Sequence, residues 1–83
     1  MQILYFAWVR EGIGSSAETV TPPAGVATVG ALIAWLREQS PRHAETLKDR
    51  KRLRVAVNQD FADDAAPIRP GDEVAIFPPV TGG

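Results

Sequence analysis

One stretch of the chain repeats apolar residues with the period of a helix, and it lies between short strand-like runs. Its four apolar residues follow the i, i+3, i+4, i+7 spacing of a single buried stripe: Val29, Leu32, Ile33 and Leu36. Thr28 is a suitable N-cap for this helix, and Ser40 and Pro41 end it. One main helix at residues 29–39 cannot supply a whole core, so strands must supply the rest.

The first nine residues are apolar and aromatic and contain no glycine or proline, which predicts one strand over residues 1–9. Strand periodicity divides this run between two faces, with Ile3, Tyr5, Ala7 and Val9 on one and Leu4, Phe6 and Trp8 on the other. After a loop at residues 10–16, residues 17–21 can pair back as a second strand.

The second half of the chain predicts two more strands. Residues 53–58 alternate between two faces, with Leu53, Val55 and Val57 pointing inward and Arg54, Ala56 and Asn58 pointing outward. A loop is expected at residues 60–69, with a short strand at 66–69, and a turn at residues 69–72. The last strand, residues 73–77, would bury Val74 and Ile76 and expose Ala75 and Phe77. The polar residues 42–52 are expected to form a second short helix or a turn.

This order of elements predicts an α+β chain with a mixed sheet of four to five strands packed on one main helix. The first and last strands are the natural central pair, which is the β-grasp, or ubiquitin-like, arrangement. We expect a domain at residues 1–77 and an extended C-terminal Gly-Gly tail at residues 78–83.

Composition narrows the possible functions. The chain has 83 residues, 45% hydrophobic and 23% charged, which is typical of one folded domain. A net charge of -1 gives no general attraction to nucleic acid or to an anionic membrane, so neither is expected as a partner. No apolar run approaches the length of a membrane span, and the N-terminus lacks the features of a signal peptide, so we expect a cytoplasmic protein. The absence of cysteine excludes disulfides, thiolate metal sites and cysteine nucleophiles.

The final residues, PPVTGG, suggest a chemical role for the end of the chain. Pro78 and Pro79 cannot continue a sheet and favour an extended exit from the domain. Gly82 and Gly83 have no Cβ atom, so a partner enzyme can enclose the terminal carbonyl closely. The carboxylate of Gly83 could be activated as an acyl-adenylate, from which a sulfur nucleophile displaces AMP. Val80 and Thr81 complete this tail.

Three segments give the chain a resemblance to the small, sulfur-carrying subunits of molybdopterin synthase: the ending DEVAIFPPVTGG, residues 56–59 and the opening FAWVRE. The resemblance covers the whole chain and implies a β-grasp fold. It further implies that a ubiquitin-activating-like adenylyltransferase uses ATP to adenylate Gly83, which then becomes a thiocarboxylate, with the sulfur donor left open. The sulfur would pass to cyclic pyranopterin monophosphate in the active site of a large subunit, within a heterotetramer. The small subunit of that family is non-catalytic and holds no resident cofactor or metal.

The resemblance also implies a partner-binding surface that contains Phe6, Arg10, Phe61 and Phe77. Phe61 departs from the family pattern, in which an aliphatic residue is more common at that position. Strand periodicity points to the same surface independently, because it places Leu4, Phe6, Trp8, Ala75 and Phe77 on the face away from the helix. An open apolar face of this kind marks an interface. The alternative is a second packing layer made by residues 42–52 or 60–69.

Other motifs give weaker signals. The basic cluster Lys48, Arg50, Lys51, Arg52 and Arg54 is either a solvated loop or a docking site for an acidic partner surface. The adjacent carboxylates Asp63 and Asp64 have no third ligand at useful spacing and are expected in a turn. His43 is expected to be exposed. Three alternative functions stay open: a sulfur carrier for another pathway such as thiamine synthesis, a ubiquitin-like protein modifier, and a passive binding module.

Overall fold

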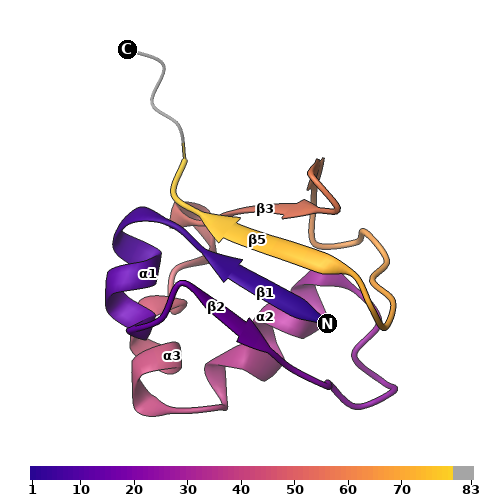
Figure 1. Ribbon diagram of the computed structural model, residues 1–83, viewed down its shortest axis with the longest axis horizontal. Helices are drawn as coiled ribbons and strands as arrows, with labels where there is room; N and C mark the ends of the chain where they lie inside the picture. The colour runs from indigo at the N-terminus through magenta and orange to yellow at the C-terminus, as the bar shows by residue number, and fades with distance from the viewer. Residues whose placement is uncertain (80–83) are drawn as a thin grey trace.

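The computed structural model describes residues 1–79, which form one sheet with helices on one of its faces (Figure 1). The strands are β1 (Gln2–Tyr5), β2 (Ala17–Thr19), β3 (Arg54–Val57), β4 (Asp60–Ala62) and β5 (Glu73–Phe77). The helices are α1 (Ala7–Ile13), α2 (Val29–Arg37) and α3 (Pro41–Thr46), with a 3-10 turn, η1, at Arg50–Arg52.

The sheet has the order β2-β1-β5-β3-β4, with the first and last strands of the chain at its centre. β1 and β5 run parallel, with Ile3 opposite Val74 and Tyr5 opposite Ile76. The other three pairings are antiparallel. The predicted mixed sheet and its central pair are therefore confirmed.

The core lies between this sheet and the three helices. Its members come from β1, α1, α2, β3 and β5 and from three positions between elements: Ile3, Tyr5, Val9, Ile13, Val29, Leu32, Ile33, Leu36, Leu47, Leu53, Val55, Ile68, Val74 and Ile76. The predicted stripe of α2 is buried in full, and the backbone N–H of Ala31 donates a hydrogen bond to the Thr28 hydroxyl, 3.2 Å away. The single main helix and its N-cap are confirmed, although α2 ends at Arg37 and is followed by α3 and η1.

The predicted strand at residues 1–9 is wrong beyond Tyr5. The chain turns at Phe6 and Ala7, whose φ is 52°, and continues as α1. The physical reason is a change of period, because Val9 and Ile13 lie four residues apart and both enter the core from one face of a helix. Gly14, with φ at 90°, ends α1 in a left-handed C-cap, so most of the expected loop at residues 10–16 is helical.

The predicted loop at residues 60–69 is also partly wrong. Asn58 and Gln59 both have positive φ, at 50° and 73°, and form the two-residue turn that connects β3 to β4. β4 is an edge strand that starts at Asp60, where we expected only loop. The short strand expected at residues 66–69 is reduced to one isolated bridge between Thr28 and Pro67.

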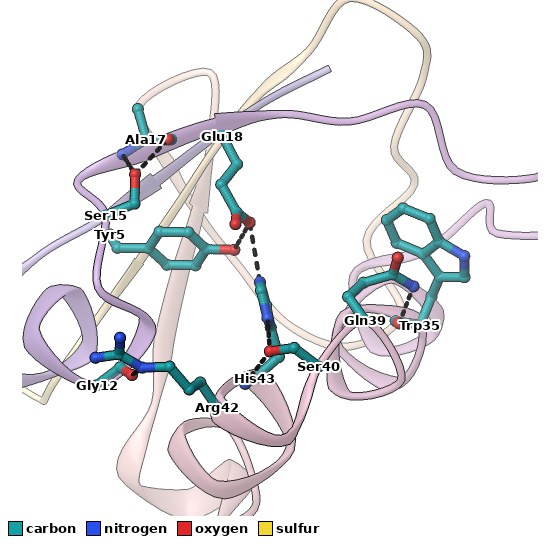
Figure 2. Close-up of polar contacts among 10 residues, drawn as sticks. All are labelled: Tyr5, Gly12, Ser15, Ala17, Glu18, Trp35, Gln39, Ser40, Arg42 and His43. Carbon is teal, nitrogen blue, oxygen red and sulfur yellow. Dashed lines mark hydrogen bonds and ion pairs between the residues drawn. The ribbon is translucent and has the colours of Figure 1, made fainter.

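His43 was expected to be exposed, and the structure shows it buried at 8% exposure. Its Nδ1 lies 2.7 Å from the Ser40 hydroxyl oxygen, and its Nε2 lies 3.0 Å from a carboxylate oxygen of Glu18 (Figure 2). The Tyr5 hydroxyl donates to the same oxygen at 2.8 Å. This partly buried group of polar side chains ties α3 to β1 and β2.

Candidate partner-binding face

The face of the sheet away from the helices carries a row of apolar side chains. The strand register places Leu4 opposite Ala75, Ala75 opposite Ala56, and Ala56 opposite Phe61. These residues alternate along their strands with Tyr5, Ile76 and Val55, which are buried on the helix side. The row is therefore the outward half of the sheet, as the sequence predicted for Leu4 and Ala75.

Three phenylalanines make this row prominent. Phe61 is 86% exposed on the edge strand β4, and Phe6 is 47% exposed between β1 and α1. Phe77, at the end of β5, is half-buried, and its ring centre lies 6.0 Å from that of Phe61. A pair of rings at this distance is a favourable aromatic contact. We call the surface formed by Leu4, Phe6, Phe61, Ala75 and Phe77 the apolar face.

The apolar face occupies only one end of the sheet. Toward the start of β5 the outward positions become polar, with Gln2 opposite Thr19 and opposite Glu73. Asn58 follows β3 there and donates its backbone N–H to the Glu73 carbonyl at 2.8 Å. The apolar residues therefore gather toward the end of the sheet where β5 finishes and the chain leaves it (Figure 1).

Arg10 lies beside this face, and Trp8 does not belong to it. The backbone N–H of Arg10 donates to the Phe6 carbonyl at 3.3 Å, which places the exposed Arg10 one helical turn from Phe6. Trp8 was expected on the outward face with Phe6, but α1 turns it away. Its ring instead lies 4.9 Å from the guanidinium carbon of Arg52.

The structure leaves the apolar face uncovered over residues 1–79. Residues 42–52 pack on the opposite, helical side, and β4 extends the sheet without folding over it. The second packing layer considered from the sequence is therefore absent from this part of the chain. The outward orientation predicted for Phe6 and Phe77 is confirmed, and Phe61 joins them from a strand that the sequence did not predict. The role of these residues in binding a partner stays a prediction.

The predicted tail is described only at its root. Pro78 and Pro79 follow Phe77 directly, are half-buried and form no regular secondary structure, so the sheet ends where the sequence predicted. Val80, Thr81, Gly82 and Gly83 lie outside the described residues. The proposed chemistry of Gly83 is therefore an expectation from sequence and family.

Every buried side-chain nitrogen and oxygen atom of residues 1–79 has a hydrogen-bond partner. Asp64, expected in a turn, accepts a hydrogen bond from Arg50 at 2.7 Å, and its backbone carbonyl accepts the N–H of Gly30. In this part of the chain, no group of three or more His, Cys, Asp or Glu side chains is placed to hold a metal ion. None of the described helices has the length and hydropathy needed to cross a membrane.

The sequence did not reveal the partly buried group formed by Tyr5, Glu18, Ser40 and His43. Burial by itself raises the pKa of Glu18, but hydrogen bonds from His43 and Tyr5 outweigh that effect and hold this pKa below its ordinary value. Burial, followed by the hydrogen bond to Glu18 and its charge, raises the pKa of Tyr5 well above its ordinary value. Glu18 lies in a predicted strand and His43 lies 25 positions later in a polar stretch. No periodic pattern connects the two positions, so the sequence carried no signal for this pairing.

The sheet order and the enclosed helix define a β-grasp, ubiquitin-like protein. The chain belongs to the ThiS family, whose sequence profile matches residues 3–83. It is 47% identical over 83 residues to the molybdopterin synthase sulfur carrier subunit of Escherichia coli K12, covering 100% of this chain and 99% of that protein. It is 34% identical over 86 residues to the human protein of the same name, covering 100% of this chain and 93% of that protein.

A solved structure gives the same fold. The crystal structure of small archaeal modifier protein 1 from Haloferax volcanii matches 96% of this chain and 97% of its own chain, with a TM-score of 0.76 and 30% identity. The predicted β-grasp fold is thus confirmed. The resemblance to the small subunits of molybdopterin synthase, first seen in three segments, is confirmed over the full length.

Proposed function

We propose that the protein is a sulfur carrier in the biosynthesis of molybdopterin, the organic part of the molybdenum cofactor. In this proposal the carboxylate of Gly83 is the reacting group, and residues 1–77 form the domain that partner proteins bind. The protein is the non-catalytic, sulfur-donating subunit of a molybdopterin synthase. It works in the cytoplasm and holds no cofactor of its own.

The observation that carries this proposal is the position of the apolar face relative to the end of the chain. β5 ends at Phe77, in the middle of the exposed phenylalanines, and Pro78 and Pro79 follow at once. A partner that covers Phe6, Phe61 and Phe77 would therefore receive residues 78–83 at its own surface. The names of the relatives from Escherichia coli and human support the same role.

The proposed chemistry takes place in two partner enzymes. In the adenylyltransferase, an oxygen of the Gly83 carboxylate attacks the α-phosphorus of ATP and pyrophosphate leaves. Sulfide then attacks the carbonyl carbon and AMP leaves, which gives the thiocarboxylate directly. If the sulfur arrives as a persulfide of the donor, the product is an acyl disulfide, and a donor thiol attacks its S–S bond to form a disulfide and release the thiocarboxylate. In the large subunit, this sulfur is transferred to cyclic pyranopterin monophosphate, and two such transfers complete the dithiolene. Glycine suits each step because it has no Cβ atom next to the reacting carbonyl.

The test is the intact mass of the protein purified from cells, together with its activity when combined with the large subunit. We expect a fraction in which one terminal oxygen is replaced by sulfur. Deletion of Gly83, or addition of one residue after it, should abolish sulfur transfer and leave thermal unfolding unchanged, because the core ends with β5. Substitution Gly25→Ala, in an exposed loop where an added Cβ meets nothing within 4 Å, is the control and should retain full activity. Sulfur transfer by either length variant would refute the proposal.

A ubiquitin-like modifier is the second candidate, and the 30% identity to small archaeal modifier protein 1 favours it. The same mass experiment distinguishes the two. A modifier would be found in isopeptide linkage to lysines of other proteins, whereas a carrier would be found as the free thiocarboxylate. A carrier for thiamine synthesis would form the thiocarboxylate but would not support molybdopterin formation with the large subunit.

A further inference from the structure

We infer that the basic residues after α3, together with Trp8, form a docking rim for an acidic segment of a partner protein. We define the basic rim as Lys51, Arg52 and Arg54, with the groove beside Trp8. This inference rests on the proposed function, because the partner is a protein that receives the C-terminal tail. It adds the requirement that the partner's surface carries acidic side chains where it meets the basic rim.

Cationic side chains are concentrated in one short segment. Five of the nine lysine and arginine residues lie between positions 48 and 54, although the whole chain has a net charge of -1. A local excess of this kind creates a positive potential on one part of a surface that is otherwise slightly acidic. Residues 48–54 are therefore the part of the sequence with the highest density of positive charge.

The fold uses only some of these charges internally. Arg50 bonds the Asp64 carboxylate and the Leu53 carbonyl, both at 2.7 Å, and so holds the segment to its neighbours. Lys48 pairs with Glu45. Lys51, Arg52 and Arg54 are all exposed, and their side chains bond no carboxylate within residues 1–79.

The rim stands on a rigid support. Leu53, between Arg52 and Arg54, is fully buried in the core. The Asp49 carboxylate accepts the backbone N–H of Lys51 at 3.1 Å and caps η1, while Arg54 donates to the carbonyls of Lys51 and Leu53. The backbone that carries these charges is thus fixed, so binding does not incur the loss of chain entropy that a mobile loop would.

A groove beside Trp8 adds shape to the charge. It has a volume of about 220 Å³ and lies between α1 and the segment after α3, with Trp8, Gly12, Thr46 and Arg52 in its walls. The Arg52 guanidinium carbon lies 4.9 Å from the centre of the Trp8 ring, an arrangement that orients the guanidinium and leaves its N–H groups available. A carboxylate can accept two of these N–H groups while the stem of its side chain lies in the groove.

The basic rim borders the apolar face at the root of the tail. Arg54 lies opposite Phe77 in the β3–β5 register, and Trp8 is two residues after Phe6. An apolar centre with a charged margin is the ordinary arrangement of a protein interface. A protein partner is favoured over nucleic acid because the chain as a whole has a net charge of -1 and Glu45 and Asp49 lie close to the rim. A nucleic acid would bring a negative charge with every nucleotide to this mixed surface, whereas a protein segment can place a single carboxylate against Arg52.

The test is the association rate of the protein with a purified large subunit and with a purified adenylyltransferase, measured by stopped flow over a range of salt concentrations. Lys51→Glu and Arg52→Glu should each lower the rate by about fivefold or more at low salt for at least one partner. The difference should shrink at high salt, where the charges are screened. Arg69→Glu is the matched control. Arg69 is exposed in the turn before β5, whereas the rim borders the other end of β5. The association rate of this variant should stay within about twofold of the wild type.

The outcomes separate the two proposals. If the wild type binds both partners and the two rim variants associate as fast as Arg69→Glu, the basic rim is wrong and the sulfur-carrier role stands. If the wild type binds neither partner, both proposals fail. A labelled single-stranded DNA of random sequence serves as a further probe at low salt. Binding that is lost in Arg52→Glu would reassign the rim to nucleic acid and overturn the inference.

Discussion

Tyr5 is the only tyrosine of the chain, and its buried hydroxyl donates to Glu18. Its raised pKa means that the folded protein resists loss of the phenolic proton. Stability from this group is complete below the ordinary pKa of about 10 and falls as the pH rises above it. In the native protein, we expect the absorbance of the phenolate to stay low until the protein unfolds at alkaline pH. In urea, the Tyr5 hydroxyl should titrate at about pH 10, the ordinary value for tyrosine.

Tyr5→Phe tests the same contact by stability. The ring remains in the core, but the hydrogen bond to a charged carboxylate is lost, which should cost roughly 2 kcal/mol in the free energy of unfolding. Urea denaturation at neutral pH measures this cost. An unchanged midpoint would show that the hydroxyl contributes no net stability.

Glu18 contributes to stability on the acid side of the pH range. Its pKa is lower in the fold than in the unfolded chain, so its contribution is present above about pH 4.3 and is lost as the pH falls through the folded value. We expect Glu18→Gln to reduce the loss of stability on acidification, measured by urea unfolding at several pH values. Glu45→Gln, which alters an exposed pair with Lys48, is the control and should keep the wild-type pH dependence.

At the scale of elements, the turn between β3 and β4 carries backbone strain that a substitution can remove. Gln59 has a φ of 73°, which costs about 1 kcal/mol for a residue with a Cβ atom. Two-residue hairpin turns with positive φ at both residues prefer glycine at the second one, which is the position of Gln59. Gln59→Gly removes this strain but also increases the conformational entropy of the unfolded chain, which offsets part of the gain. The net effect should be a rise of about 0.5 kcal/mol in the free energy of unfolding.

Asn58→Gly is the contrasting variant in the same turn. Asn58 also has positive φ, but its side chain accepts from the Glu73 backbone N–H and donates to the Asp72 carboxylate, both at 3.1 Å. Loss of these bonds should lower stability by about 1 kcal/mol. Thermal unfolding of the two variants should therefore move in opposite directions, and a shift in the same direction would contradict this account of the turn.

Gly30 shows how a helix can accept a residue that weakens it. The added Cβ of an alanine would lie 3.2 Å from the Asp64 Cβ and 3.3 Å from the Asp64 carbonyl oxygen. That carbonyl already accepts the Gly30 N–H, so the loop approaches the first turn of α2 closely. The roughly 1 kcal/mol that glycine costs a helix is offset by this contact.

At the scale of the whole molecule, the apolar face should govern partner binding and contribute little to folding. Phe77→Asp places a charge among exposed phenylalanines, which should weaken binding of the large subunit by about 2 kcal/mol or more, because the charge would be desolvated in the complex. Titration calorimetry measures the affinity. Ala34→Asp, on the exposed side of α2, is the control and should bind normally.

The sequence by itself determined the elements whose periodicity is complete within a few residues. The stripe of α2, the alternation of β5 and the proline stop after Phe77 follow from local spacing and local backbone chemistry. The predicted alternation of β3 holds only in part, because Ala56, expected to face outward, is 8% exposed. These features were sufficient to predict the mixed sheet, its central pair and the outward position of Phe77.

The tertiary structure decided what depends on distant neighbours. The run of residues 1–9 is apolar throughout, so its own pattern allowed a long strand, and only the burial of Val9 and Ile13 beside α3 favours a helix there. His43 is buried because Glu18, 25 positions away, supplies a partner for its ring. Phe61 meets Phe77 because a two-residue turn returns β4 along β3. Each outcome depends on a contact between segments that are distant in sequence, and local spacing alone did not decide it.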